Sequence, residues 1–478
     1  MKRWIVLLTA AALAASCSQQ PTKPLFTETQ APTVAVSPAS PASPSADLAG
    51  IGDPYFPTFG NSGYDVERYD LSIKYEPASK KLTGKTTVTA KATELLSRFH
   101  LDFHGLQVSG ITIDGKAAEF SRDRDELIIV PPVAIPAGST FKTVIDYDGV
   151  PAPVSSPGLG ATGFLSTRDG AFALGEPQSA TTWFPVNDHP RDKALYTIAV
   201  TVPQNLAALS NGVLEGKSPD TGGFTTWKWR VNSPMASYLA TVAIGDYRVT
   251  EGTHDGKPVV TAIANTIPRG PIDTDMARTA EISDFLATQF GAYPFDAYGG
   301  IVIDDDRIRF ALETQTRPVY ADSFWTRGSN TSVVAHELAH QWFGDSVSVD
   351  TWQHIWLNEG FATYAQWLWG EHTGTSTAQR EFDSRYADLQ SPLWNVAPGT
   401  PGRDQIFSAS VYQRGGMALH ALRKEVGDDR FFDILKTWAR EQRDGNGTTD
   451  EFIALSERIS GEQLDALFDA WLFQKERP

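Results

Sequence analysis

The chain has 478 residues, of which 41% are hydrophobic and 11% aromatic, so it is long enough for two or three domains with sizeable cores. Its formal net charge of −16 argues against a nucleic-acid binder, which needs a basic face, and leaves a peptide or small-molecule partner open. Cys17 is the only cysteine, so a metal site in the folded part must be built from histidines and carboxylates.

Residues 1–17 have the features of an export signal. Lys2 and Arg3 give a positive start, and residues 4–15 form an apolar run that is short for a membrane span. The sequence LAASC, ending at Cys17, looks like a bacterial lipobox, although its leucine lies four residues before the cysteine where three is usual. We expect an exported protein of the cell envelope, either anchored by a lipid on Cys17 or simply cleaved and released.

Residues 18–48 are rich in Pro, Ser, Thr and Ala and contain few large apolar side chains. Such a composition cannot bury a core, so it predicts a disordered tether. Behind a lipidated cysteine, the tether would hold the folded part away from the membrane.

Residues 49–248 carry strand signals and little helix. Apolar or β-branched runs are bounded by turn dipeptides such as Asp114-Gly115 and Asp255-Gly256. The expected strands include residues 71–75, 86–92, 127–130, 141–147 and 197–202. This pattern predicts an N-terminal all-β domain with its sheets packed as a sandwich.

Residues 249–478 predict a mostly helical second domain with a small sheet. One strand is expected at residues 300–304. The expected helices are residues 273–290, 331–343, 355–369, 415–425, 430–440, 450–459 and 464–473.

The strongest chemical signal is the pentapeptide from His336 to His340, HELAH. Histidines at i and i+4 lie one turn apart on one helical face, so both imidazoles can reach one ion. The intervening Glu337 is placed to take a proton from a metal-bound water. Neutral imidazole suits zinc, so the pattern predicts a Zn²⁺ site with Glu337 as general base.

Catalytic zinc needs a third protein ligand and an open fourth position. Eighteen residues separate His340 from Glu359, which lies in the next expected helix. That spacing lets the second helix fold back and present a carboxylate to the same ion. We therefore expect His336, His340 and Glu359 to be the metal ligands.

The motifs HELAHQWFGD and WLNEGFATY resemble the aminopeptidase N and leukotriene hydrolase family of zinc peptidases. Further blocks resemble this family in the same order along the chain, at residues 176–193, 290–295, 311–313 and 411–415. The resemblance implies a saddle-like N-terminal β domain and a thermolysin-like catalytic domain. It points to a short two-domain form, because the family's large C-terminal helical-repeat domain has no counterpart here, and the cleft should be more open.

The resemblance also implies residue roles and a substrate class, namely peptides with a free N-terminus. Tyr412 would donate a hydrogen bond to the developing oxyanion. Glu313 would bind the substrate's α-ammonium group, with Glu176 as a second anchor, or its neighbour Gln178 in that role. Ala311 belongs to the same exopeptidase block and is expected to contact substrate. A pair of carboxylates beside the metal suits this task, because charge-assisted hydrogen bonds orient a cation.

Two positions depart from the family's Gly-Ala-Met-Glu-Asn block. Phe310 stands where the family has glycine, and Thr314 where it has asparagine. The glycine normally lets the substrate backbone lie close to the strand, so both substrate preference and backbone binding are open.

Two other functions remain as alternatives. A thermolysin-type endopeptidase would use the same zinc spacing, but Glu313 and Glu176 favour a free amine at the site. A non-catalytic binding lipoprotein would be expected to lack the base or a ligand, yet all of them are present. The preferred first residue and the oligomeric state stay open.

Overall fold

Two long antiparallel strands, β1 (Tyr64–Glu76) and β2 (Lys81–Ala92), run through the centre of the largest sheet. Buried and more exposed residues alternate along both strands, as expected where one face of a sheet covers a core. The computed structural model describes residues 49–478, so the expected export signal, Cys17 and the tether lie outside the described residues.

The largest sheet has eight strands in the order β14-β15-β12-β1-β2-β8-β4-β5. All neighbours are antiparallel except β1 and β12, which run parallel. Its other strands are β4 (Gln107–Ile113), β5 (Lys116–Ala117), β8 (Thr140–Gly149), β12 (Ala194–Pro203), β14 (Val213–Pro219) and β15 (Phe224–Met235).

Two smaller sheets cover the largest one. One has the order β13-β16-β11-β10-β9 and the other β3-β7-β6. Their strands are β3 (Phe99–Asp102), β6 (Glu119–Asp123), β7 (Glu126–Val130), β9 (Val154–Ser156), β10 (Gly160–Ser166), β11 (Ala171–Leu174), β13 (Ala207–Ser210) and β16 (Val242–Gly245). Rings from facing sheets meet in the core: the ring centroids of Tyr75 and Phe164 are 5.2 Å apart, and those of Tyr64 and Phe99 are 5.7 Å apart.

A second five-stranded sheet, in the order β17-β18-β19-β21-β20, begins the expected catalytic half. Its strands are β17 (Tyr247–His254), β18 (Lys257–Ala264), β19 (Tyr298–Ile303), β20 (Ala311–Leu312) and β21 (Val319–Ala321), and a separate pair is β22 (Ser348–Val349) with β23 (Asn446–Gly447). Strand β20 is at the edge of this sheet. The expected domain boundary between residues 248 and 249 falls inside β17 and stays a prediction.

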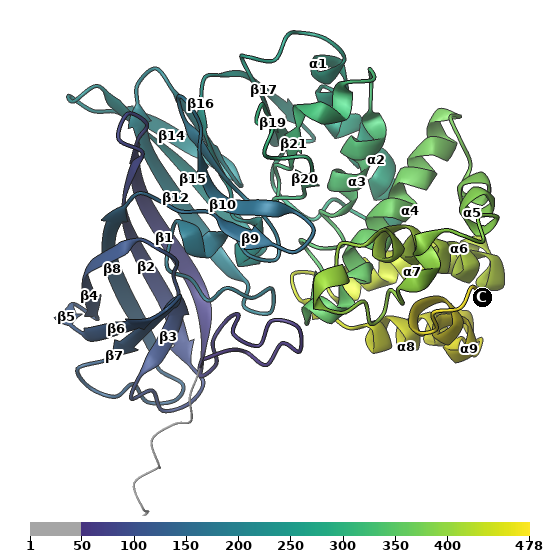
Figure 1. The fold of residues 1–478 in the computed structure, drawn as a ribbon, viewed down its shortest axis with the longest axis horizontal. Helices are drawn as coiled ribbons and strands as arrows, with labels where there is room; N and C mark the ends of the chain where they lie inside the picture. The colour runs from purple at the N-terminus through teal and green to yellow at the C-terminus, as the bar shows by residue number, and fades with distance from the viewer. Residues whose placement is uncertain (1–48) are drawn as a thin grey trace, which may run out of the picture. The chain divides into compact units, whose positions relative to one another are not determined.

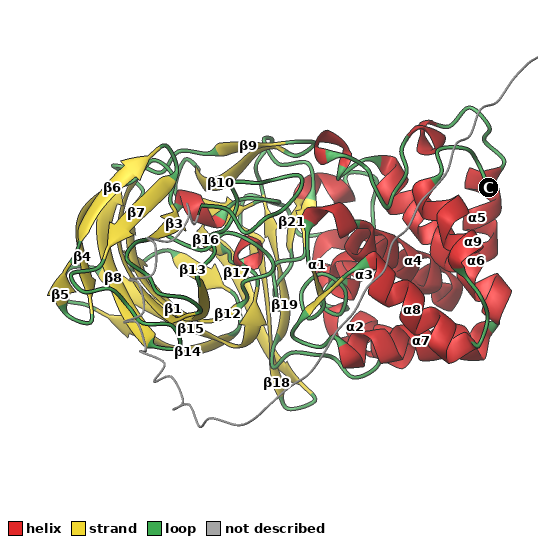
Figure 2. Cartoon of the chain, turned by 90° about the horizontal axis from the view of Figure 1, so that it is seen from below, coloured by secondary structure: helices red, strands yellow, loops and turns green. Residues whose placement is uncertain are grey.

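Helices make up most of the remaining chain (Figures 1 and 2). They are α1 (Pro271–Met276), α2 (Thr279–Phe290), α3 (Thr331–Ala339), α4 (Trp356–Thr373), α5 (Ala378–Tyr386), α6 (Gly415–Val426), α7 (Asp428–Glu441), α8 (Thr449–Ser460) and α9 (Asp465–Phe468). The expected fold class, a sheet-rich N-terminal region followed by a helical catalytic region, is confirmed. Among residues 49–478, no helix has both the length and the apolar character needed to cross a bilayer.

The expected helix at residues 273–290 is instead two helices, α1 and α2. The chain breaks at Ala277 and Arg278, where the Thr279 hydroxyl donates to the Met276 carbonyl oxygen at 2.8 Å. Helix α5 has no counterpart among the expected helices. In its sequence AQREFDSRY only one side chain, Ala378, is fully buried, so the periodic apolar signal of a packed helix is weak. The two turn dipeptides do form hairpins: Asp255 and Gly256 both have positive φ, the conformation that a tight two-residue turn between β17 and β18 requires.

Ionic contacts join the β-rich half to the catalytic half. Arg191 donates to both carboxylate oxygens of Asp350, at 3.1 and 2.9 Å. Lys193 is partly buried and donates to the carbonyl oxygens of Asp345 and Ser346, at 2.8 and 2.9 Å. These contacts hold the loop that precedes β12 against the segment that follows α3. They therefore fix the position of this part of the β-rich half relative to the helix that carries the HELAH motif.

Candidate active site

Helix α3 carries two of the expected metal ligands. It starts at Asn330, whose side-chain oxygen accepts a hydrogen bond from the Val333 backbone N–H at 3.3 Å, a typical N-cap. The helix ends at Ala339, earlier than the expected residue 343, and its C-cap residue His340 lies one turn after His336; the two imidazole centroids are 4.9 Å apart.

Helix α4 presents the third ligand. The Glu359 Oε2 atom lies 3.3 Å from Nε2 of His336 and 3.5 Å from Nε2 of His340. Atoms bound about 2.1 Å from a tetrahedral zinc are about 3.4 Å from one another. Both measured separations match an edge of that tetrahedron, so the three side chains fit zinc.

The outer nitrogens of both imidazoles are occupied. Nδ1 of His336 lies 3.0 Å from Oε1 of Gln366, and Nδ1 of His340 lies 2.9 Å from the Phe343 carbonyl oxygen. Because these oxygens only accept, each Nδ1 carries a proton, and in the neutral form of each ring Nε2 is left with the lone pair that a metal ion needs. Both Nε2 atoms face Glu359, so a cation bound between the three side chains would pair with all of them.

The charged side chains around His336, His340 and Glu359 favour a positive charge between them. Burial alone would lower the pKa of His340, but Glu313 and Glu359 outweigh burial and raise it well above its usual value. Burial alone would raise the pKa of Glu359, but His340 and His336 outweigh burial and hold it at about 2. The site therefore keeps Glu359 ionised and ready to bind a cation.

A cavity of about 310 Å³ opens beside the metal ligands. Besides the three ligands, its lining includes the expected base Glu337, the expected oxyanion donor Tyr412, and Glu313, Glu176 and Ala311. Gln178 does not line this cavity; its backbone carbonyl oxygen accepts from Thr162 at 3.2 Å. Phe310 does line it, so the ring that replaces the family's glycine lies at the site itself.

Two carboxylates in this cavity are almost inaccessible: Glu176 is 1% exposed and Glu313 is 2% exposed. Burial raises the pKa of both, and Glu313 adds to the rise at Glu176. The Tyr238 hydroxyl donates to Oε1 of Glu313 at 3.1 Å, whereas Oε1 of Glu176 has no hydrogen-bond partner among the described residues. A buried anion without a partner is costly, so this pair suits a cationic group of a ligand.

Edge strand β20 offers free backbone groups to the cavity. The Phe310 carbonyl oxygen accepts from the Ala321 N–H at 3.4 Å. Because hydrogen-bonded and non-bonded pairs alternate along antiparallel strands, the backbone N–H and C=O of Ala311, which is opposite Tyr320, point away from β21. Thr314, which replaces the family's asparagine, is buried and donates its hydroxyl to the Arg317 carbonyl oxygen at 2.7 Å. It therefore supports the turn after the strand and does not line the cavity.

Among the side chains at the site that sequence reasoning missed, three are polar groups with a clear task or charge. Tyr238 holds Glu313, Gln366 orients His336, and Arg309 lines the cavity. Only Arg309 carried a local signal, since it directly precedes the 310–314 block. Tyr238 is 75 residues from Glu313 in sequence, and Gln366 is 30 residues from His336, so only the folded chain brings them together.

With this geometry in view, two regions match families of known proteins. Residues 65–239 match the peptidase M1 N-terminal domain, and residues 320–471 match the peptidase family M1 domain. Together they span more than half of the chain. The chain belongs to the M1 family of zinc peptidases. The family suggested by the sequence motifs is thereby confirmed, and zinc is the family's metal.

Solved structures and curated relatives agree with this M1 assignment. The M1 zinc metallopeptidase of Deinococcus radiodurans is 29% identical, with a TM-score of 0.80, over 90% of this chain and 98% of that one. Aminopeptidase M1 of Arabidopsis thaliana is 25% identical over 89% of this chain, and aminopeptidase N of Lactobacillus helveticus is 26% identical over 87%. The chain spans about half the length of these two curated relatives, 52% and 51%.

Proposed function

We propose that this M1 chain is a zinc-dependent aminopeptidase that removes the N-terminal residue from peptides. One observation carries the proposal: the cavity beside His336, His340 and Glu359 also contains two buried carboxylates, Glu176 and Glu313. A pair of anions next to the reacting bond selects a substrate with a free ammonium group at that point.

Glu337 is the general base in this proposal. Zinc, when bound, lowers the pKa of a water molecule that it coordinates and polarises the substrate carbonyl group. Glu337 lies on the same helix as both histidines, is not one of the three ligands, and lines the cavity. It accepts a proton from the attacking water and passes it to the leaving amine.

Tyr412 is the oxyanion donor. It lies on the π-helical turn Ser410–Arg414, and its ring is stacked on His336 with centroids 6.0 Å apart and planes 14° from parallel. Burial and Glu359 raise the pKa of Tyr412 well above its usual value, so its hydroxyl keeps its proton. A protonated phenol at the cavity wall donates to the carbonyl oxygen as negative charge develops there.

Glu176, Glu313 and Ala311 hold the substrate. The two carboxylates receive the α-ammonium group, and the outward backbone groups of Ala311 pair with the peptide as an added strand. A mutant of the Deinococcus radiodurans enzyme, which is 28% identical to this chain, has been solved with the substrate Tyr-Ser-Ala bound. A tripeptide with a free amine is the kind of ligand that this arrangement accommodates.

The experiment is hydrolysis of a panel of amino-acid p-nitroanilides by protein lacking residues 1–48, with an N-acetylated copy of the best substrate beside it. We expect cleavage of free-amine substrates only, loss with a chelator, and recovery with zinc. Equal cleavage of the acetylated copy, or of internal bonds in a blocked peptide, would replace this proposal with endopeptidase activity. Bound zinc without any cleavage would favour a binding lipoprotein.

We further propose that the protein is exported and anchored through Cys17. The support is the sequence pattern of residues 1–17, which lies outside the described structure. Palmitate labelling in a bacterial host should mark the full chain but not Cys17→Ser. Equal labelling of both, or labelling of neither, would rule out this anchor.

A further inference from the structure

The candidate cavity has one permanent positive charge. Of its lining residues, Arg309 is the only lysine or arginine, among four glutamates: Glu176, Glu313, Glu337 and Glu359. Within residues 49–478 the Arg309 side chain is exposed and makes no hydrogen bond or ion pair with another residue. An unpaired guanidinium beside an anionic cavity is an open site for a carboxylate.

The position of Arg309 along the chain indicates which part of a substrate it meets. Glu313 lies two residues after Ala311, and Arg309 lies two residues before it. A peptide with its amine at Glu313 and its backbone paired with Ala311 continues towards residue 309. Two residues of extended chain span at most about 7 Å, so the second or third substrate residue comes within reach of the Arg309 side chain.

Charge explains why the chain needs a cation there. A short peptide carries a carboxylate only a few ångströms from its amine, and the carboxylates that are not zinc ligands, Glu176 and Glu313 among them, repel it in a partly desolvated cavity. We propose that Arg309 is a binding residue for a substrate carboxylate located one or two residues beyond the scissile bond. The carboxylate is either the C-terminus of a di- or tripeptide or an acidic side chain. This inference rests on the proposed aminopeptidase function and names its preferred substrates.

Binding to a Glu337→Gln variant loaded with zinc tests this directly, because the peptides stay intact. Calorimetry compares Leu-Gly-Gly with its C-terminal amide, and Leu-Gly-Asp-amide with Leu-Gly-Asn-amide. In at least one pair we expect the peptide with the carboxylate to bind about 3- to 10-fold more tightly than the peptide with the amide in its place. Such a preference lies between that of an exposed ion pair and that of a buried one. The pair that shows the preference identifies the source of the carboxylate.

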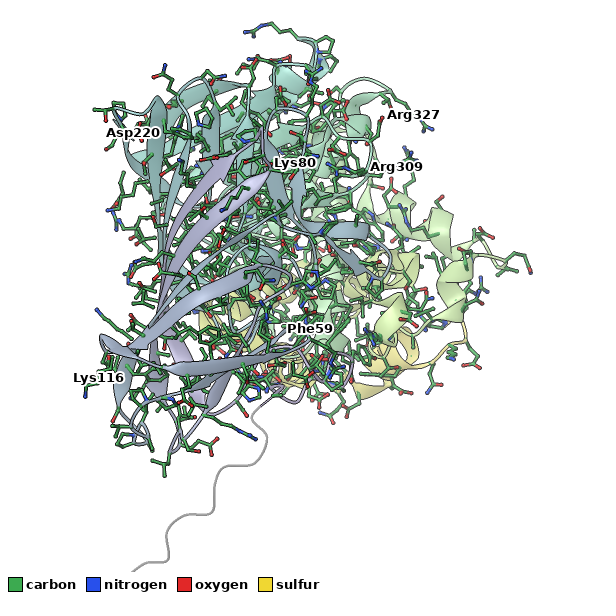
Figure 3. All side chains as sticks on the ribbon, turned by 60° about the vertical axis from the view of Figure 1, so that its left-hand side comes forward. Phe59, Lys80, Lys116, Asp220, Arg309 and Arg327 are labelled. Carbon is green, nitrogen blue, oxygen red and sulfur yellow. The ribbon has the colours of Figure 1, made fainter. Side chains whose placement is uncertain are left out.

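The matched variants are Arg309→Ala, Arg309→Lys and Arg327→Ala, each made in the Glu337→Gln background. Arg327, labelled with Arg309 in Figure 3, is also exposed and unpaired among the described residues, and it does not line the cavity. The preference should fall to about 1 in Arg309→Ala, persist in part in Arg309→Lys, and remain unchanged in Arg327→Ala. It should also weaken at high salt.

Two outcomes overturn the inference. In one, acids and amides bind equally before Arg309 is changed; in the other, Arg309→Ala keeps the full preference. Either result leaves the aminopeptidase proposal standing if the unmutated enzyme cleaves leucine p-nitroanilide and spares the acetylated copy. Failure of that cleavage overturns both, whereas cleavage without binding of any peptide to the Glu337→Gln variants overturns the inference alone.

Discussion

Glu337 has the environment of a general base. Burial raises its pKa well above the usual carboxylate value, although His340 opposes the shift. A base works best when its pKa approaches the working pH, so a metal-adjacent glutamate in a buried position is well suited to accept and return a proton.

Changing Glu337 to Gln should therefore abolish turnover without removing the metal. We expect kcat to fall about 10²- to 10⁴-fold, the usual contribution of a general base, while zinc stoichiometry measured by atomic absorption stays the same. The exposed Glu67→Gln serves as the control. Retained turnover in Glu337→Gln would assign the base role to another residue.

Tyr238 is placed to position Glu313, the proposed amine anchor. It packs against Trp352, with ring centroids 5.3 Å apart, and its hydroxyl donates to Glu313. Phe would keep the ring and remove only that hydrogen bond, which to a charged group contributes about 1.5–3 kcal/mol.

We expect Tyr238→Phe to raise KM for free-amine substrates roughly tenfold, with a smaller change in kcat, because Glu313 loses its orientation. Steady-state kinetics on leucine p-nitroanilide measures both constants. Tyr196→Phe is a close match, since the Tyr196 hydroxyl is also buried but has no hydrogen-bond partner among the described residues. Equal KM values for the two variants would show that Tyr238 does not position Glu313.

At the scale of elements, the site depends on how closely α4 approaches the start of α6. Gly360 follows the ligand Glu359 on α4, and Gly415 begins α6 three residues after Tyr412. A Cβ atom added at Gly360 would lie 2.9 Å from the backbone carbonyl carbon of Gly415. The absence of side chains at both positions thus sets the separation between the proposed metal ligand Glu359 and the proposed oxyanion donor Tyr412.

Replacing Gly360 by Ala should force the two helices apart. We expect a loss of about 1–3 kcal/mol in the free energy of unfolding, measured by urea denaturation, together with lower kcat. A Cβ atom added at Gly370, on the same helix, would lie an ordinary 3.5 Å from Oγ1 of Thr375, so Gly370→Ala should instead stabilise by about 0.5–1 kcal/mol. Similar stability of both variants would refute the close-approach argument.

At the scale of the whole molecule, stability depends on buried carboxyl groups in the loop that meets the catalytic half. Burial raises the pKa of Asp188 to about 7 and that of Asp192 to about 8. The unfolded chain titrates these groups near 3.8, so between that pH and about 8 the folded chain binds more protons. Their contribution to stability is present below about pH 4 and is lost as the pH rises through 7 to 8.

We therefore expect the Tm of the protein to decline from pH 5 to pH 8, and Asp188→Asn to decline less steeply. Asparagine keeps an oxygen for the Ser237 hydroxyl, which donates to Asp188 at 2.6 Å, but it does not titrate. The comparison uses the slope of Tm against pH by calorimetry, with the exposed Asp404→Asn as control. An unchanged slope in Asp188→Asn would contradict the assigned shift.

The sequence by itself determined the features that depend on local spacing. The i, i+4 histidines lie on one helical face because an α-helix has 3.6 residues per turn, and strands alternate with a period of two, so the zinc motif and the fold class were readable. The fold class and the family are confirmed. The site roles of Glu337, Tyr412, Glu313 and Glu176 stay predictions, although the chain gathers all four around one cavity.

Only the tertiary structure decided the features that depend on contacts distant in sequence. Tyr238 reaches Glu313, Gln366 turns His336, and Gln178 is left outside the cavity, because packing of sheets and helices sets these separations. The break between α1 and α2 could likewise not be predicted, because the helical period of apolar residues continues through it. Local periodicity indicates which face a side chain occupies, but the partner on the facing element is determined by close packing of the whole core.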